Sequence, residues 1–418
     1  MMEGLGFRPY EAYKDSHASW LGEVPAHWQV GPGRICTYEN KDKNTGMKES
    51  TVLSLSYGRV IVKDEDKMTG LVPESYETYQ IVQPGDIIIR GTDLQNDVTS
   101  LRTGLAKDHG IITSAYINLR PKPNAYADFL HYLLHSYDVK KVFYGLGSGL
   151  RQNLSYVDFK YLTIPLPSLP EQRAIVAFLD DKCAKIEGAV KIKEDQIALL
   201  RERRQIIIQE AVTRGLNPAA PMKDSGIDWI GQIPAHWEVK RFKHFFSTAM
   251  GETILGENLI DDGKIPVYSA TEGDHFFGYV NKSKVSLSAG DLVIPARGNS
   301  IGFPKLVAAP ATCSQTTIYA KKLRGISSEF VFFYLLSCKR FLFQFIQTAI
   351  PQITVDEVKN NILLLPPPHE QVNLVEYCED ITLRFDGAIA IKRRQIDALN
   401  EYKTSLINAA VTGKIKVI

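Results

Sequence analysis

Residues 6–30, GFRPYEAYKDSHASWLGEVPAHWQV, return further along the chain as residues 215–239, GLNPAAPMKDSGIDWIGQIPAHWEV. Twelve of these 25 aligned positions are identical, among them Trp20 and Trp229 and the closing Pro-Ala-His-Trp of each stretch. A long match at one fixed spacing is the signature of an internal duplication, which has to be recognised before the fold can be assigned. The sequence therefore predicts two similar halves.

A second match closes each half. PLPSLPEQ at residues 165–172 recurs as LLPPPHEQ at residues 364–371, and Ala211-Val-Thr recurs as Ala410-Val-Thr. Between the two matched ends the spacing drifts by several residues, and small length changes of this kind mark surface loops. Each half is thus expected to be one variable globular region followed by one similar tail.

The tails are predicted to be long helices. After each Glu-Gln pair, apolar side chains recur at steps of three and four residues, the period of a coiled-coil seam. Ser168 and Glu171 also form a capping-box pattern before the first helix. The predicted seam positions of the first copy are Ile175, Leu179, Ile186, Val190, Ile197, Leu200 and Ile207. Those of the second copy are Leu374, Phe385, Ile389, Ile396, Leu399 and Leu406.

The expected fold class is α+β, with two similar α/β domains joined by two long antiparallel helices. The helices should be antiparallel because the second globular region leaves the end of one helix and returns to the start of the other. The N-terminal repeat segment 6–30 matches the segment that follows the first helix, so we expect a pseudo-circular, pseudo-two-fold arrangement. The predicted boundaries are 1–170 and 215–366 for the domains, and 171–214 and 367–418 for the spacer helices.

The composition excludes several classes of protein. A chain of 418 residues with 44% hydrophobic and 23% charged residues is typical of a soluble folded protein. Its formal net charge of +2 is not the surplus of a histone-like protein, so a nucleic-acid site would have to be a local basic patch. The five scattered cysteines include no C-x-x-C pair, and the N-terminus lacks a signal-peptide pattern. We expect a cytoplasmic protein with no membrane partner.

Recognisable enzyme motifs are missing. Gly251 to Gly256 is followed by Glu257 and Asn258, where a phosphate-binding loop needs Lys and Ser or Thr. His131 and His135 are four residues apart, but Tyr132 stands where a zinc-binding H-E-x-x-H pattern has glutamate. We therefore expect a chain with no catalytic residues, no metal site and no cofactor of its own, and the repeated His-Trp pairs are interpreted as structural corners.

Two similar surfaces held by a helical spacer suit a long ligand with near two-fold symmetry, such as double-stranded DNA. Arg, Asn and Gln in loops are the candidate readers, because their donors and acceptors match guanine and adenine edges. In the first half the candidates are Arg90, Arg102, Arg151, Gln152 and Asn153. In the second half they are Arg297, Asn299, Lys305, Gln315, Gln347 and Gln352.

Two other interpretations stay open on these grounds. A non-catalytic protein scaffold could use the same two arms on a coiled-coil rod, and an enzyme could assemble a site from residues that form no sequence motif. DNA binding through phosphate contacts weakens steeply with salt, so salt dependence separates a DNA-binding protein from a scaffold.

The order of these motifs resembles one known family, the specificity (S) subunits of type I restriction-modification systems. The resemblance rests on W-[LI]-G-x-[VI]-P-x-H-W at Trp20 and Trp229, on RQNLS and PQIT at residues 151–155 and 351–354, and on the proline-rich segments that end in Glu-Gln. It spans essentially the whole chain.

The resemblance implies two target-recognition domains, each of which reads one half of a split DNA site, held apart by the two helices. It implies partners: two modification subunits that bind S-adenosylmethionine and methylate adenine, and restriction subunits that use ATP and Mg²⁺ to translocate and cleave DNA. The chain itself would be a non-catalytic DNA-recognition subunit.

Overall fold

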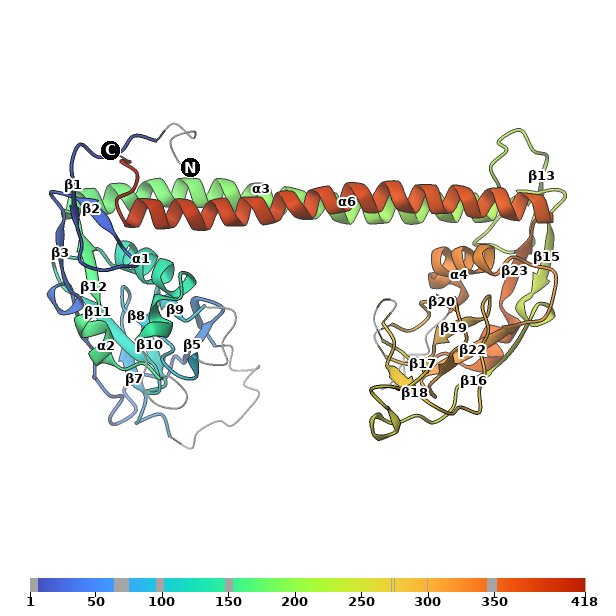
Figure 1. Cartoon of the computed structure of the whole chain (residues 1–418), viewed down its shortest axis with the longest axis horizontal. Coiled ribbons are helices and arrows are strands. Elements are labelled where there is room, and N and C mark those ends of the chain that lie inside the picture. The colour runs from blue at the N-terminus through green and yellow to red at the C-terminus, as the bar shows by residue number, and fades with distance from the viewer. Residues whose placement is uncertain are drawn as a thin grey trace. The chain divides into compact units, whose positions relative to one another are not determined.

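The computed structural model describes residues 7–63, 75–94, 101–146, 153–271, 273, 275–298, 300–343 and 352–417. The chain divides into two compact units, Met1–Ile192 with Arg394–Ile418 (unit 1) and Lys193–Arg393 (unit 2). Each unit contains one part of each long helix, α3 (Leu169–Arg214) and α6 (Pro368–Val411). The compact units therefore include the spacer helices that the sequence placed in segments of their own (Figure 1).

Unit 1 is built around a four-stranded antiparallel sheet with the strand order β4-β11-β8-β9. Its strands are β1 (Tyr13–Asp15), β2 (Glu23–Pro25), β3 (Gln29–Pro32), β4 (Thr37–Glu39), β5 (Leu53–Ser56), β6 (Arg59–Val62), β7 (Gln80–Val82), β8 (Ile87–Ile89), β9 (Thr103–Leu105), β10 (Gly110–Ile112), β11 (Ile117–Pro121) and β12 (Thr163–Leu166). Its own helices are α1 (Ala127–Val139) and α2 (Tyr156–Tyr161).

Unit 2 repeats this plan with the sheet order β16-β22-β19-β20. Its strands are β13 (Met222–Asp224), β14 (Gln232–Pro234), β15 (Glu238–Arg241), β16 (Phe246–Met250), β17 (Ile265–Tyr268), β18 (Gly278–Val280), β19 (Leu292–Pro295), β20 (Lys305–Leu306), β21 (Thr312–Cys313), β22 (Thr317–Lys322) and β23 (Ile362–Leu365). Its own helices are α4 (Ser328–Leu342) and α5 (Val355–Asn360).

One helix in each unit lies between the sheet and the paired long helices (Figure 1). In unit 1, Phe129 and Leu133 of α1 are fully buried in one cluster with Ile175 of α3 and Leu406 of α6. In unit 2, Phe330 of α4 is fully buried in one cluster with Val212 of α3 and Leu374 of α6. Among the described residues, no helix is long and apolar enough to span a membrane.

The predicted seam of the long helices lies in their packed faces. Every predicted seam position is buried or half-buried. Within unit 1 the first part of α3 packs against the last part of α6, and within unit 2 the last part of α3 packs against the first part of α6. This pairing makes the two helices antiparallel.

Two ion pairs between the helices repeat at equivalent positions. Lys403 of α6 pairs with Glu187 of α3 in unit 1, and Arg204 of α3 pairs with Asp386 of α6 in unit 2. Each partner lies 199 residues from its counterpart, because 386 − 187 and 403 − 204 both equal 199. Exposed ion pairs of this kind add little stability, so we infer that these two pairs fix the register of one helix against the other.

Each long helix is followed by a glycine that packs against its own unit. Gly215 and Gly413 have φ angles of 74° and 72°, a left-handed conformation that favours glycine. A Cβ atom on Gly413 would lie 2.2 Å from Cδ of Pro25, and one on Gly215 would lie 3.3 Å from the ring of Trp237. Only a residue without a side chain lets the chain turn this close to the repeat segment.

The two described ends of the chain pair with each other in unit 1. The backbone N–H of Lys416 donates to the carbonyl oxygen of Arg8 at 2.8 Å. The segment after α6 therefore meets the first repeat segment, as the pseudo-circular arrangement requires.

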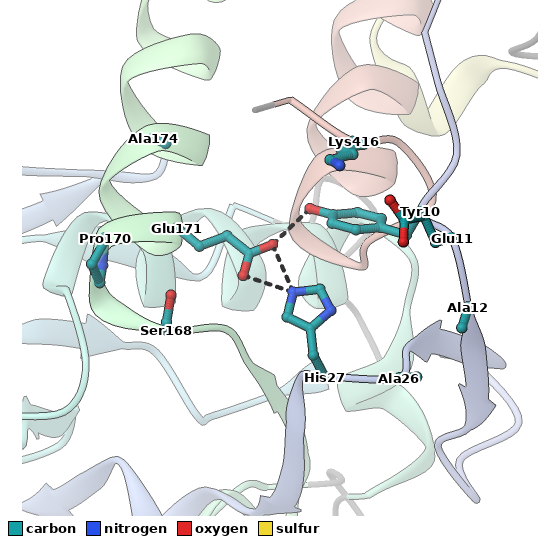
Figure 2. Close-up of a pocket in the computed structure, with 10 residues that line it drawn as sticks. All are labelled: Tyr10, Glu11, Ala12, Ala26, His27, Ser168, Pro170, Glu171, Ala174 and Lys416. Carbon is teal, nitrogen blue, oxygen red and sulfur yellow. Dashed lines mark hydrogen bonds and ion pairs between the residues drawn. The ribbon is translucent and has the colours of Figure 1, made fainter.

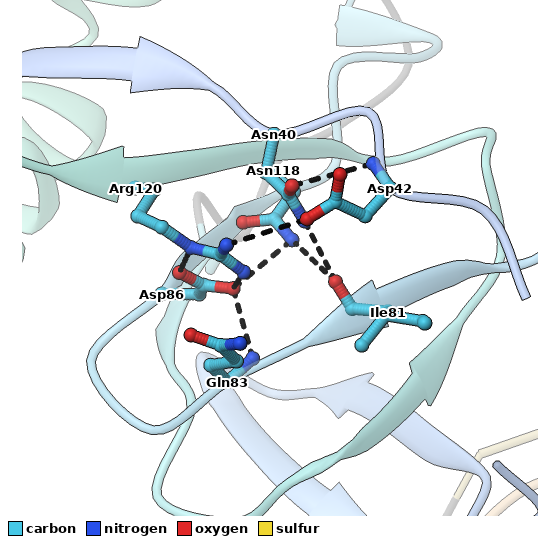
Figure 3. A network of polar contacts seen from close by, with 7 residues as sticks. All are labelled: Asn40, Asp42, Ile81, Gln83, Asp86, Asn118 and Arg120. Atoms are coloured by element: carbon cyan, nitrogen blue, oxygen red, sulfur yellow. Dashed lines mark hydrogen bonds and ion pairs between the residues drawn. The ribbon is translucent and has the colours of Figure 1, made fainter. Parts of the chain in front are cut away.

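A buried aspartate stabilises the turn before the central strand of each unit. In unit 1, Asp86 accepts from the backbone N–H of Gln83 at 2.9 Å and from two nitrogens of Arg120 at 2.7 Å each (Figure 3). This bidentate pair raises the pKa of the Arg120 guanidinium above its usual range. In unit 2, Asp291 accepts from the backbone N–H of Ser288 at 2.9 Å. The same turn is thus built twice, with an added ion pair in unit 1.

Candidate nucleic-acid interface

The repeated tryptophans anchor the start of each long helix. Trp28 and Trp237 are fully buried, and each indole Nε1 donates to a glutamate of the Glu-Gln pair. The distances are 2.9 Å from Trp28 to Glu171 and 2.8 Å from Trp237 to Glu370. The His-Trp pairs are therefore structural corners, as the sequence predicted, and Glu171 bonds to this corner in place of the expected capping box.

The glutamine of each pair attaches the long helix to the shorter helix beneath it. The side-chain carbonyl of Gln172 accepts from the backbone N–H of Tyr126 at 2.7 Å, just before α1. That of Gln371 accepts from the backbone N–H of Ser327 at 2.7 Å, just before α4. The duplicated Glu-Gln motif therefore fixes the sheet domain of each unit to its helices.

A cavity of about 600 Å³ opens beside the unit 1 corner (Figure 2). At its centre the Glu171 carboxylate accepts from the hydroxyl of Tyr10 at 2.9 Å and lies 3.1 Å from Nε2 of His27. Burial and the neighbouring Glu171 raise the pKa of Tyr10 above its usual range, so the phenol keeps its proton and donates. Because these polar groups bond to one another, we interpret the cavity as part of a structural joint.

Two of the predicted readers of unit 1, Arg90 and Asn153, lie where the central sheet ends. Arg90 follows β8 and its side chain is exposed, while its backbone N–H donates to the carbonyl oxygen of Arg102 at 2.9 Å. The segment before α2 returns to the same place, because the N–H of Leu154 donates to the carbonyl oxygen of Gly91 at 2.7 Å. The exposed Asn153 therefore lies next to the strand end, where its Oδ1 accepts from the N–H of Asp93 at 2.9 Å.

The same joint occurs in unit 2. The N–H of Ile353 donates to the carbonyl oxygen of Ala296 at 3.0 Å, just after β19. Arg297 and Gln352 face each other as an antiparallel bridge, and both residues are exposed. We call Arg90 with Asn153, and Arg297 with Gln352, the reader edges of the two units.

Three of the predicted readers have structural roles instead. Arg102 is fully buried, and its guanidinium donates to the carbonyl oxygens of Arg90, Thr92 and Asp93 at 3.0, 2.7 and 2.9 Å. Lys305 is 4% exposed, and its Nζ donates to the carbonyl and hydroxyl oxygens of Thr271.

Gln315 is half-buried, and its side-chain carbonyl accepts from the N–H of Ile254 at 3.0 Å. The predicted base contacts of Arg102, Lys305 and Gln315 are thus replaced by contacts that hold loops within the units. The remaining candidates, Arg151, Gln152, Asn299 and Gln347, lie outside the described residues.

The α1 histidines are half-buried. Burial and the nearby His135 lower the pKa of His131 to about 4, so this ring is neutral near pH 7. Across the part of the chain that the structure describes, no three His, Cys, Asp or Glu side chains gather as a metal site would require.

Comparison with known proteins adds independent evidence. Residues 40–194 and 234–401 match the family described as type I restriction modification DNA specificity domain. The MjaVIII specificity subunit of Methanocaldococcus jannaschii is 27% identical over 74% of this chain and 75% of its own length. The EcoKI specificity subunit of Escherichia coli K12 is 22% identical over 94% of this chain and 90% of its own length.

The fold also matches a solved structure, from work on the complex assembly and conformational transition of the type I R-M system. The two chains are 16% identical with a TM-score of 0.69, and the match covers 93% of this chain and 98% of the other. Specificity subunits of this family are non-catalytic. Because the two matches together cover well over half of the chain, this chain belongs to the type I restriction-modification DNA specificity family.

Proposed function

We propose that the chain is the DNA sequence-recognition subunit of a type I restriction-modification complex, and that each unit reads one half of a split site. The supporting observation is the duplicated reader edge, which exposes Arg90 with Asn153 and Arg297 with Gln352 at equivalent joints. Guanidinium groups match guanine edges and side-chain amides match adenine edges.

The proposal includes partners that supply the chemistry. Two modification subunits would bind S-adenosylmethionine and methylate adenine, and restriction subunits would use ATP and Mg²⁺, all in the cytoplasm. Within unit 2 the long helices offer exposed apolar side chains on which these subunits would dock. These are Leu199, Ile206, Leu383 and Ile391, with exposures of 64, 46, 75 and 49%.

Mapping of N6-methyladenine in the genome tests the proposed function. Cells that express the chain and its modification subunit should methylate one split motif with a fixed spacing, and deletion of the gene should abolish it. Exchange of residues 31–165 for those of another family member should then change one half of the motif only. A genome without a gene-dependent motif, despite expressed partners, would contradict the proposal and favour a scaffold.

Binding to DNA should also depend on salt. Phosphate contacts release counterions, so affinity should fall steeply between about 50 and 200 mM salt. A complex whose binding does not change with salt would not be reading duplex DNA through basic side chains such as Arg90 and Arg297.

A further inference from the structure

A hairpin that the sequence did not reveal is present in both units. In unit 1, β5 pairs with β6, and Val52 at its start forms a parallel bridge with Ile111. In unit 2, β17 pairs with β18 and runs parallel to β21, with Val267 opposite Thr312. The same hairpin is therefore attached at the same place twice.

The unit 1 hairpin ends in an unusual turn. Ser56 pairs with Arg59, which leaves the two-residue turn Tyr57-Gly58. Their φ angles are 46° and 78°, so both residues are left-handed, as in a type I′ turn. Asn, Asp or Gly usually fills the first position, because a bulky side chain is strained there.

Among the residues that the structure describes, no hydrogen bond or ring contact of the Tyr57 side chain offsets this strain. Its side chain is 85% exposed, which is the largest exposure among the exposed large hydrophobic residues of the described chain. Residues in strained backbone regions persist where the structure over-determines them, and they cluster at functional sites. An exposed aromatic ring in this position is therefore better explained by a ligand than by the stability of the hairpin.

The turn lies beside the reader edge of unit 1. A Cβ atom on Gly58 would lie 3.6 Å from Cδ2 of Leu101 and 3.7 Å from the carbonyl oxygen of Thr103. The residue between them, Arg102, accepts from the backbone N–H of Arg90 through its carbonyl oxygen. The Tyr57-Gly58 turn therefore packs against residues 101–103, and Arg102 of this segment is hydrogen-bonded to the backbone of Arg90.

Unit 2 shows the same neighbourhood with other residues. A Cβ atom on Gly298, directly after Arg297, would lie 3.9 Å from Cβ of Ala270 in the connection between β17 and β18. This connection also presents aromatic rings, because Phe276 and Phe277 are 39% and 37% exposed. Both hairpins therefore present aromatic side chains near a reader edge.

We propose that Tyr57 is a DNA-contacting residue whose ring packs against the sugars and base edges of the half-site bound by unit 1. This inference rests on the proposed function and deepens it. Arg59 and Lys63 are exposed on the same hairpin and would meet phosphates, which matches the charge of duplex DNA. The apolar surface of Ile61, which is 46% exposed and alternates with Arg59 and Lys63 along the strand, would be covered by the same ligand.

The substitution Tyr57→Asn separates a binding role from a structural one. Asn-Gly is a preferred type I′ turn, so the variant should fold and unfold at the same temperature or a higher one. Loss of the ring should weaken binding about tenfold, the scale of one aromatic contact with a base. Tyr161→Asn is the matched control, because Tyr161 is 59% exposed on α2 and is not part of the hairpin.

The measurement uses the complex of the full chain with its modification subunits and a labelled duplex that carries the mapped split motif. Weaker binding by Tyr57→Asn, with unchanged binding by Tyr161→Asn, supports the inference. A photo-crosslinking amino acid at position 57 should also attach to the duplex, whereas one at position 161 should not. Equal binding by all three complexes, or no crosslink at position 57, overturns the inference and leaves the proposed function intact. If the unsubstituted complex does not bind the duplex, both are overturned.

Discussion

Replacement of Glu171 should destabilise unit 1 far more than replacement of Glu370 destabilises unit 2. The two glutamates are counterparts, but their surroundings differ. The Glu171 side chain is 6% exposed, whereas the Glu370 side chain is 27% exposed. Glu171 also accepts from Tyr10, and the repeat has Ala219 at the position of Tyr10.

The magnitude follows from the donors that each substitution leaves without an acceptor. Glu171→Ala strands the buried Trp28 indole and the Tyr10 hydroxyl, and each stranded donor costs about 1–3 kcal/mol, so the expected loss is about 3–5 kcal/mol. Glu370→Ala strands one buried indole, and the expected loss is about 1–2 kcal/mol. The histidines contribute little because both are largely exposed.

Hydrogen exchange detected by mass spectrometry resolves the two units within one sample. The reporter amides are those of β12 in unit 1 and β23 in unit 2, both of which pair with the strand after the His-Trp corner. A difference of about 2 kcal/mol corresponds to roughly a 30-fold difference in protection. Glu171→Gln keeps one acceptor oxygen and should recover part of the loss. Equal losses at the two positions, or a larger loss in unit 2, would refute the reasoning from burial and donor number.

Three further outcomes follow from the structure. Unit 1 should lose stability as pH falls from about 6.5 to about 4, because unfolded His131 takes up a proton that the folded residue resists. His131→Phe should therefore reduce the pH dependence of urea unfolding, and an unchanged slope would contradict this. The double substitution Leu200→Glu with Leu399→Glu places charges in the helix seam and should prevent co-purification with the modification subunits. Recovery of a full-affinity complex would show that the seam does not hold the helices together. Arg102→Gln should lower the free energy of unfolding of unit 1 by about 2 kcal/mol or more and leave the methylated motif unchanged. A changed motif in a stable variant would show that Arg102 contacts DNA bases after all.

The helices and the duplication could be predicted from the sequence because both depend on short-range or repeated patterns. A seam of apolar residues every three to four positions needs no knowledge of distant contacts, and the positions from Ile175 to Leu406 lie in the packed faces. In each case the signal was local and was repeated in the other half of the chain.

The reader edges could not be predicted at the level of single residues. Arg90 and Arg102 are both arginines at the ends of neighbouring strands, and composition cannot tell which one points outward. In the structure Arg90 and Arg102 lie opposite each other just beyond the paired residues Ile89 and Thr103. The Arg90 residue is exposed, whereas the Arg102 guanidinium is buried among carbonyl oxygens. Which of the two is buried depends on the loops that pack around them, so their exposure required the structure.

At Tyr57 the local sequence preference disagrees with the structure that forms. Local preference argues against a tight hairpin at Ser56-Tyr57-Gly58-Arg59, because tyrosine is disfavoured at the first left-handed position. The hairpin forms nevertheless, since the bridge from Val52 to Ile111 and the four paired positions of β5 and β6 hold it in place. Where tertiary structure overrides a local preference without gaining a contact, the cost is best explained by function. The conflict at Tyr57 is thus itself evidence that the ring meets a ligand, and the Tyr57→Asn variant tests that explanation directly.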